Sequence, residues 1–269
     1  MNVREMVGTH DFVLITLDTL RYDVAEGAMA SGTTPNLQQI LSGGGWERRH
    51  SPATFTYAAH QAFFAGFLPT PVAPGPHPRP FAMAFEGSET TTDTTAVFDA
   101  PELVTGLRTQ GYHTICIGGV GFFNKQTALG QVLPNLFDES HWSESMGVAC
   151  ATSTKKQVAL ACERLAVAGA EPVFLFINVS ALHQPNNMYL DPTVPDSAES
   201  QAAALAYVDG ALAPLFDALR ERGKVFGIIC ADHGTAYGED GYTGHRLSHP
   251  VVLDVPYGEF YFNGGNDSP

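Results

Sequence analysis

The sequence predicts an α/β protein with a mostly parallel, doubly wound sheet between two layers of helices. Two continuous apolar runs, residues 12–17 and 225–231, are rich in Val, Ile and Phe, as is typical of strands buried on both faces of a parallel sheet. Between them strand-like and helix-like segments alternate, with connections long enough for crossover helices. The 269 residues, 44% of them hydrophobic, suffice for one large core. We expect a single domain over residues 1–269.

Boundary residues help to place the individual elements. Thr34 and Pro35 mark a helix start, as N-cap and first helical residue, and the glycines at 43–45 mark its end. Gly210 and Pro214 interrupt a long helical pattern. In chain order we expect strand 12–17, helix 34–41, a loop entering a helix at 51–66, an extended Pro-rich excursion at 69–80, helix 101–111, strand 112–118, helix 153–168, strand 173–179, helix 198–222, strand 225–231 and one or two edge strands within 251–262.

Composition and charge exclude several classes of partner. The chain carries 14 Lys and Arg against 28 Asp and Glu, a formal net charge of -14, so we expect no nucleic-acid partner. Residues 1–11 lack the apolar core of a signal peptide, and the apolar stretches fall short of the roughly 20 residues of a membrane-spanning helix. We therefore expect no membrane partner and a cytoplasmic location. The four cysteines are scattered, and Cys116 and Cys230 fall within strands as small buried hydrophobes.

Acidic and imidazole side chains follow the first and the last of the long apolar runs. Asp18 comes directly after residues 12–17, and Asp232 and His233 come directly after residues 225–231. Open α/β folds bind ligands at the carboxyl edge of the sheet, so we expect these side chains to meet there. Mixed carboxylate and imidazole ligands suit Zn or Mn better than Ca or Mg, which indicates a metal-dependent hydrolase. The structural alternative for Asp18 is a helix cap or an Asx-turn.

Several short motifs occur in an order that points to one family. They are Leu-Ile-Thr-Leu-Asp-Thr-Leu-Arg at 14–21, Thr-Pro-Asn-Leu at 34–37, Gly-Phe-Leu-Pro at 66–69, Gln-Gly-Tyr-His-Thr at 110–114, a strand leading to His-Gln-Pro at 176–185, and Ala-Asp-His-Gly at 231–234. In this order they resemble the sulfatase-like branch of the alkaline phosphatase superfamily. The resemblance implies an alkaline-phosphatase-like three-layer fold, with the family's smaller C-terminal subdomain reduced or absent, in a small cytoplasmic member of bacterial type.

The resemblance also places a nucleophile. Counting back from Gly66 puts residues 56–60, Thr-Tyr-Ala-Ala-His, on the family's nucleophile segment. True sulfatases carry a cysteine there that is converted to formylglycine, whereas this segment begins with Thr56 and holds no cysteine, which favours phosphoryl transfer. Ala58 and Ala59 depart from the family pattern. Thr56 at a helix start can also serve as an N-cap, and His60, one turn later on the same face, is either catalytic or bonded to a buried carbonyl.

Further residues acquire roles from the same resemblance. His183 matches the histidine of the family's H-x-P motif and is expected to protonate the leaving group or hold a substrate oxygen. His245 occupies the region where relatives place a Lys or His against the transferred group. His249 is a candidate ligand of a second metal, although Ala181 stands where two-metal relatives supply an extra Asp, so we expect one metal. The remaining candidates, possible substrate contacts after the glycine-rich turn at 118–121, are Asn124 and Lys125.

The leading interpretation is a metal-dependent hydrolase of phosphate mono- or diesters. Thr56 acts as nucleophile in it, coordinated by the metal that Asp18, Asp232 and His233 hold, and a covalent phosphothreonine forms. The alternatives are a phosphoryl-group transferase or mutase with the same site, a sulfatase-like sulfuric ester hydrolase, and a noncatalytic metal-binding scaffold. We expect a small anionic ester as substrate, and the sequence leaves its identity and the oligomeric state open.

Overall fold

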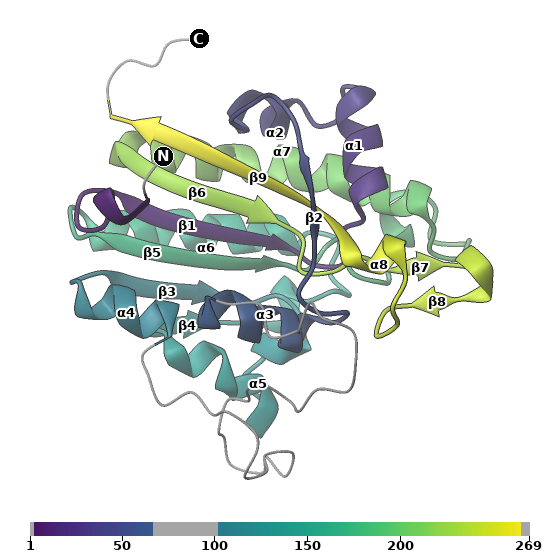
Figure 1. Cartoon of the computed structure of the whole chain (residues 1–269), viewed down its shortest axis with the longest axis horizontal. Helices are drawn as coiled ribbons and strands as arrows, with labels where there is room; N and C mark the ends of the chain where they lie inside the picture. The colour runs from purple at the N-terminus through teal and green to yellow at the C-terminus, as the bar shows by residue number, and fades with distance from the viewer. Residues whose placement is uncertain (1–2, 67–101, 265–269) are drawn as a thin grey trace, which may run out of the picture.

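A seven-stranded sheet organises the computed structural model, which describes residues 3–66 and 102–264 (Figure 1). The strand order is β2-β9-β6-β1-β5-β3-β4. The five strands from β6 to β4 run parallel, whereas β9 is antiparallel to both of its neighbours. The strands are β1 Asp11–Leu17, β2 Glu47–His50, β3 His113–Ile117, β4 Glu139–His141, β5 Val173–Val179, β6 Lys224–Cys230 and β9 Asp254–Asn263. The predicted mostly parallel sheet is therefore confirmed.

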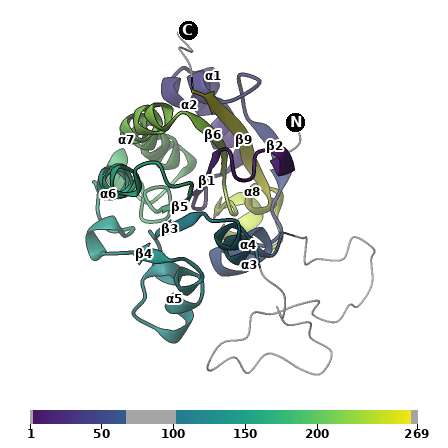
Figure 2. The ribbon, with the colours of Figure 1, turned by 90° about the vertical axis from the view of Figure 1, so that its left-hand side faces the viewer.

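Helices cover both faces of the sheet (Figure 2). Side chains of α1, α2, α6 and α7 pack in one core and those of α3 and α4 in the other. The helices are α1 Tyr22–Ala30, α2 Pro35–Ile40, α3 Thr56–Ala65, α4 Leu103–Thr109, α5 Ala128–Val132, α6 Ser153–Ala168, α7 Ala198–Arg222 and α8 Pro250–Leu253. Shorter elements are the hairpin β7 Ala236–Tyr237 and β8 Thr243–Gly244, and the 3-10 turns η1 Val3–Glu5, η2 Gly121–Phe123, η3 Pro134–Leu136, η4 Glu144–Met146, η5 Asn187–Tyr189 and η6 Glu239–Gly241. The three predicted layers are confirmed.

The alternation of side chains along the central strand decides which face carries polar groups. In β1, Val13, Ile15 and Leu17 join the core under α6 and α7, whereas Phe12 and Leu14 join the aromatic core under α3. Because successive side chains of a strand point to opposite faces, the next polar position, Thr16, lies on the α3 side. In β5, Asn178 follows Phe174 and Phe176 on that same face. The α3 face thus receives the polar groups at the carboxyl edge of the sheet.

The long helical pattern near the end of the chain is not interrupted. Helix α7 runs unbroken through Gly210 and Pro214, because burying its apolar face against the sheet outweighs one lost backbone hydrogen bond. Contrary to the expectation from sequence, α7 is long and apolar enough to span a membrane, the one such helix among residues 3–66 and 102–264. Half of its most apolar window is buried in the protein, where Leu205, Val208 and Leu212 join the core.

Strands β9 and β2 differ from the prediction for structural reasons, and the short strands β4, β7 and β8 were not predicted. The tail forms one strand, β9, which lies inside the sheet between β6 and β2 and not at its edge. The edge position belongs to β2, whose sequence Glu-Arg-Arg-His is exposed throughout and carries no apolar alternation that could have revealed it. The backbone bonds of β9 to both neighbours, over residues 254–263, fix the end of β6 and therefore the position of Asp232.

The start of α2 is capped from another helix. Thr34 occupies the N-cap position, but its hydroxyl makes no capping hydrogen bond. The backbone N–H groups of Asn36 and Leu37 instead donate to the carboxylate of Asp209 on α7, at 3.2 and 2.8 Å. The predicted helix and its N-cap position at Thr34 are therefore confirmed, but the capping bonds come from Asp209. The family motif beyond Gly66, the Pro-rich segment 69–80 and Pro101 lie outside the described residues.

The cysteines give a testable consequence of this packing. All four are free thiols, and burial raises the pKa of Cys116 and that of Cys230, the latter to about 12. Cys150 is partly exposed, and its hydrogen bond with Thr152 lowers its pKa. We expect iodoacetamide at pH 7.5 to alkylate Cys150 at least about tenfold faster than the two buried thiols, since the thiolate is the reactive form. Peptide mass spectrometry over time measures this order, and equal rates would contradict the packing described.

Candidate metal centre and active site

Three potential metal ligands converge at the carboxyl edge of the sheet. Asp18 follows β1, and Asp232 and His233 follow β6, the strand paired with β1. One ligand atom from each side chain lies within 4.8 Å of the others, and all three side chains are fully buried. Among residues 3–66 and 102–264 this is the one such group. Pairing of β1 with β6 thus brings together side chains more than two hundred positions apart.

The two carboxylates are electrostatically incomplete without a cation. Asp18 Oδ1 and Asp232 Oδ2 are buried and have no hydrogen-bond partner within the described parts of the chain. Burial raises the pKa of Asp18 to about 6, with a contribution from the neighbouring Asp232, and burial raises the pKa of Asp232 to about 7. A buried carboxylate with one unpartnered oxygen is unfavourable in its charged form. The pair therefore fits a bound divalent cation.

His233 is held in the form that binds metals. Its Nδ1–H donates to the carbonyl of Gly234 at 2.8 Å, which leaves Nε2 with a free lone pair. Burial lowers the pKa of His233, which favours the neutral ring. A Cβ atom at Gly234 would lie 2.0 Å from the carbonyl oxygen of Val251, so only glycine permits this close approach of the loop to α8.

Two residues that the sequence analysis did not identify hold the carboxylates in place. Asn178 donates from Nδ2 to Asp18 Oδ2 at 3.1 Å, and its Oδ1 accepts the backbone N–H of Val120 at 3.0 Å. The backbone N–H of Thr19 donates to Asp232 Oδ1 at 3.2 Å. Thr19 has a φ of 64°, which is rare for a β-branched residue. A polar residue near the end of an apolar strand was the available signal for Asn178.

Thr56 places a hydroxyl beside these ligands. It is the first residue of α3, and its Oγ1 lies 3.3 Å from Asp18 Oδ2 and 3.3 Å from His233 Nε2. Phe55, in the N-cap position, makes no side-chain capping bond. Such a helix start favours anions. Thr56 also lines a pocket of about 380 Å³.

His60 supports the site and has no free nitrogen for proton transfer. Its Nδ1–H donates to the carbonyl of Thr56 at 2.7 Å, and its Nε2 accepts from Thr16 Oγ1 at 3.0 Å. The ring is fully buried against Phe63, Phe123 and other aromatic rings, and burial lowers its pKa to about 3. Of the two roles considered from the sequence, these contacts favour the structural one.

The structure brings two of the remaining histidines to Thr56. His183 and His245 line the same pocket, with ring centroids 5.5 Å apart, and His245 lies 4.6 Å from the ring of His233. Burial, followed by the charge of His233, lowers the pKa of His245 to about 3. Nδ1 of His183 donates to the carbonyl of Gln184 at 2.6 Å, which leaves its Nε2 for a ligand.

The last sequence candidates divide between the pocket and the surface. Asn124 lines the Thr56 pocket, and so does Arg246, which the sequence analysis did not single out. Lys125 does not line it, because its ammonium group donates to the carbonyl of Ser140 at 3.1 Å. His249 caps α8 through the N–H of Val251 and contacts Asp240, so it is not brought to the three ligands.

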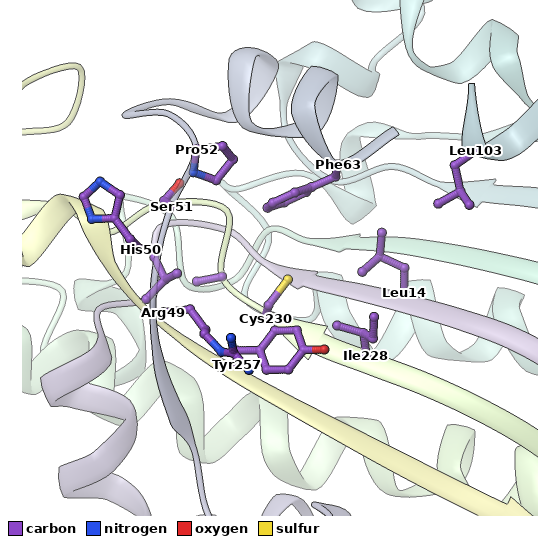
Figure 3. Close-up of a pocket in the computed structure, with 12 residues that line it drawn as sticks. Leu14, Arg49, His50, Ser51, Pro52, Phe63, Leu103, Ile228, Cys230 and Tyr257 are labelled. Carbon is purple, nitrogen blue, oxygen red and sulfur yellow. The ribbon is translucent and has the colours of Figure 1, made fainter. Parts of the chain in front are cut away.

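A second, apolar cavity of about 280 Å³ lies on the same face of the sheet (Figure 3). Cys230, Phe63 and Tyr257 line it, and none of the three potential metal ligands does. Ser51 borders it and donates from its hydroxyl to the backbone carbonyl of Asp232. The cavity therefore adjoins the strand that carries Asp232 but is separate from the pocket at Thr56.

Sequence and structure comparisons agree on the class of protein. A central mostly parallel sheet with a carboxylate and imidazole cluster at its carboxyl edge defines an α/β protein with a candidate metal centre. The profile of the sulfatase family matches residues 10–256. The chain therefore belongs to the sulfatase family. The family predicted from the motifs is confirmed.

Solved structures share the fold at low sequence identity. The soluble domain of lipooligosaccharide phosphoethanolamine transferase A from Neisseria meningitidis is 14% identical, with a TM-score of 0.64 over 96% of this chain and 78% of that one. The C-terminal periplasmic domain of EcEptC from Escherichia coli, in a complex with Zn, is 15% identical, with a TM-score of 0.59 over 94% and 73%. A protein in the alkaline phosphatase superfamily from Vibrio parahaemolyticus is 18% identical, with a TM-score of 0.59 over 94% and 60%. Curated proteins give no significant match.

The paired carboxylates predict how metal and pH affect stability. A buried acid whose pKa is raised from 3.8 to about 6 or 7 loses its stabilising contribution as pH rises through that range, and a cation offsets the resulting charge. We expect saturating Zn²⁺ or Mn²⁺ to raise Tm by roughly 5–10 °C at pH 7.5 and by much less at pH 5, where protons compete. Thermal scans with metal or with EDTA measure both shifts. A larger shift at pH 5 would contradict the assignment.

Proposed function

We propose that this protein is a metal-dependent hydrolase of phosphate esters in which Thr56 is the nucleophile. The observation that carries the proposal is the position of Thr56 Oγ1, 3.3 Å from both Asp18 Oδ2 and His233 Nε2 at the start of α3. A divalent cation held by Asp18, Asp232 and His233 supplies Lewis acidity, which lowers the pKa of a nearby hydroxyl and offsets charge on phosphoryl oxygens. The donor set suits Zn or Mn, and the related Escherichia coli domain is a Zn complex.

The proposed reaction proceeds in two substitutions at phosphorus. The Thr56 oxygen attacks, its proton passes to Asp18 Oδ2, the bond from phosphorus to the leaving oxygen breaks, and a phosphothreonine forms. The backbone N–H groups at the start of α3 bind the phosphoryl oxygens. Water then attacks phosphorus and gives its proton to His183, the bond to Thr56 breaks, and the Thr56 oxygen takes back the proton held by Asp18. His183 is the proposed proton donor to the leaving oxygen, because His245, with its pKa lowered to about 3, is neutral near pH 7 and suits hydrogen bonding.

A second candidate is transfer of the phosphoryl group to an alcohol. The similarity to a phosphoethanolamine transferase favours it, since the same residues allow a hydroxyl to replace water in the second step. Sulfate esters are a weaker proposal, because residues 56–60 contain no cysteine for conversion to formylglycine. The excess of acidic residues supports a small anionic ester over a nucleic acid as the substrate.

Trapping the covalent intermediate tests the proposal. Metal-loaded protein is mixed with p-nitrophenyl phosphate, quenched in acid within milliseconds and digested for mass spectrometry. We expect one phosphoryl group on the peptide that contains Thr56, together with phosphate as the product. Transfer predicts the phosphorylated alcohol when glycerol or ethanolamine is added. Turnover without label on Thr56 would contradict the proposed nucleophile, and label without metal would contradict the metal's role.

A further inference from the structure

We propose that Arg246 is a specificity-determining residue that selects substrates carrying a second negative charge. It favours phosphate monoesters over diesters whose second ester arm is neutral. This inference rests on the proposed function and names the substrate class of the same site. The shared chemistry is an anionic group next to the transferred phosphoryl group, whether it is the second charge of a monoester or a charge on the other ester arm.

Arg246 is fixed to the segment that presents the nucleophile. It lines the Thr56 pocket, and its backbone N–H donates to the carbonyl of Thr54 at 2.8 Å. Its guanidinium carbon lies 5.5 Å from the ring centre of Phe55. Since Thr54 and Phe55 lead directly into Thr56, these contacts keep the guanidinium beside the start of α3.

The guanidinium of Arg246 has no carboxylate partner among residues 3–66 and 102–264. Seven other arginines in those residues each pair with a carboxylate: Arg21, Arg48, Arg49, Arg108, Arg164, Arg220 and Arg222. In a chain with twice as many acidic as basic residues, an unpaired guanidinium that lines the pocket of the nucleophile fits an anionic ligand.

The charges of the site favour a doubly charged substrate. Asp18 and Asp232 together balance one divalent cation. Arg246 then leaves the site with a net positive charge, reinforced by the N-terminus of α3. A guanidinium binds phosphate oxygens through paired hydrogen bonds, which a diester with a neutral second arm satisfies less fully.

The backbone of Arg246 provides a way to separate folding from recognition. Its φ of 71° lies in the left-handed region that favours glycine. Arg246→Gly therefore removes the guanidinium while relieving the backbone, whereas Arg246→Met removes the charge and keeps the strain. Arg246→Lys keeps the charge. The matched control is Arg220→Met. Arg220 lies in the last turn of α7 and also stacks on an aromatic ring, since its guanidinium carbon lies 5.0 Å from the ring centre of Phe262.

The test compares two substrates that share one leaving group. We measure kcat/KM for p-nitrophenyl phosphate and for methyl p-nitrophenyl phosphate with the metal-loaded wild type and the four variants. Arg246→Met and Arg246→Gly are expected to lower the monoester-to-diester ratio by roughly 10- to 100-fold, with Tm of the glycine variant at or above that of wild type. Arg246→Lys recovers part of the ratio, and Arg220→Met leaves it unchanged. An unchanged ratio in both Arg246→Met and Arg246→Gly would overturn the proposal.

Two further arms identify the source of the charge and separate this proposal from the nucleophile. A diester with a carboxylate on its second ester arm should reach a kcat/KM close to that of the monoester only if Arg246 binds a charge on that arm. Calorimetric binding of inorganic phosphate to metal-loaded Thr56→Ala protein requires no chemistry. We expect Arg246→Met in that background to weaken phosphate binding at least about tenfold. Unchanged phosphate binding in this variant would contradict the role of Arg246, even if Thr56 is shown to be the nucleophile. Weakened phosphate binding would support the role of Arg246, even if Thr56 is shown not to be the nucleophile.

Discussion

Replacing Thr56 with alanine is expected to lower the turnover of a phosphate monoester by at least about 10³-fold. The oxygen that attacks phosphorus is lost, whereas the three metal ligands and the backbone donors of α3 remain. Because Asp18, Asp232 and His233 are untouched, the metal content of the variant should stay close to that of wild type. Steady-state kinetics with p-nitrophenyl phosphate, together with elemental analysis of the same samples, measure both quantities.

Thr56→Ser is the matched control for this prediction. Serine keeps a hydroxyl at the first position of α3 and removes only a methyl group, so we expect turnover within about tenfold of wild type. If the alanine variant retains metal-dependent turnover near the wild-type rate, another group attacks phosphorus. In that case the distances of 3.3 Å from Thr56 Oγ1 to Asp18 and His233 reflect only packing at the helix start.

Replacing Asp18 with asparagine is expected to change activity and metal-free stability in opposite directions. The amide oxygen can still accept from Asn178, and the amide nitrogen then occupies the position of the unpartnered Oδ1. The loss of one anionic ligand should weaken divalent metal binding at least about 10²-fold and reduce turnover with it. A well-folded variant without activity therefore separates metal binding from structural stability.

The stability of the Asp18→Asn variant depends on pH with a definite sign. Burial raises the folded pKa of Asp18 from 3.8 to about 6, so ionisation makes the metal-free wild type less stable as pH rises through this range. Asparagine cannot ionise, and we expect metal-free Asp18→Asn to be more stable than metal-free wild type by roughly 1–3 kcal/mol at pH 7.5. The advantage should shrink towards pH 4.

Urea denaturation in EDTA at both pH values measures this difference. Asp217→Asn is the control, because Asp217 is exposed and forms only a surface pair with Arg220, which is expected to contribute less than about 1 kcal/mol. A metal-free Asp18→Asn variant that is less stable than wild type at pH 7.5 would show that the ionised carboxylate stabilises the fold by itself. The two buried, unpartnered oxygens would then not indicate a bound cation.

The long buried strands and the residues directly after them were predictable from the sequence. Runs such as residues 12–17 and 225–231 carry too many apolar side chains for any position but the centre of a sheet, and β1 and β6 do pair there. Their carboxyl ends must then lie at one edge, which is why Asp18 and Asp232 meet. The short strand β2 escaped notice because its residues are polar, and its pairing depends on β9, more than two hundred positions away.

The supporting contacts of the site were not predictable in the same way. Asn178 acts through a hydrogen bond across two strands, and Thr19 acts through a backbone N–H in a left-handed conformation. Neither contact leaves a periodic pattern in the sequence. His60 was ambiguous because its spacing from Thr56 suits both catalysis and a bond to a carbonyl, and only the contact at 2.7 Å with the Thr56 carbonyl distinguishes them.

Anomalous diffraction from crystals of the metal-loaded protein tests the central claim most directly. We expect a peak at the metal's absorption edge, bound by oxygens of Asp18 and Asp232 and by Nε2 of His233 at about 2.0–2.2 Å if the metal is Zn. Thr56 Oγ1 should either lie at a similar distance from the same peak or lie next to it without binding it. A loaded crystal with no peak among these side chains, or with its metal bound elsewhere, would contradict the account.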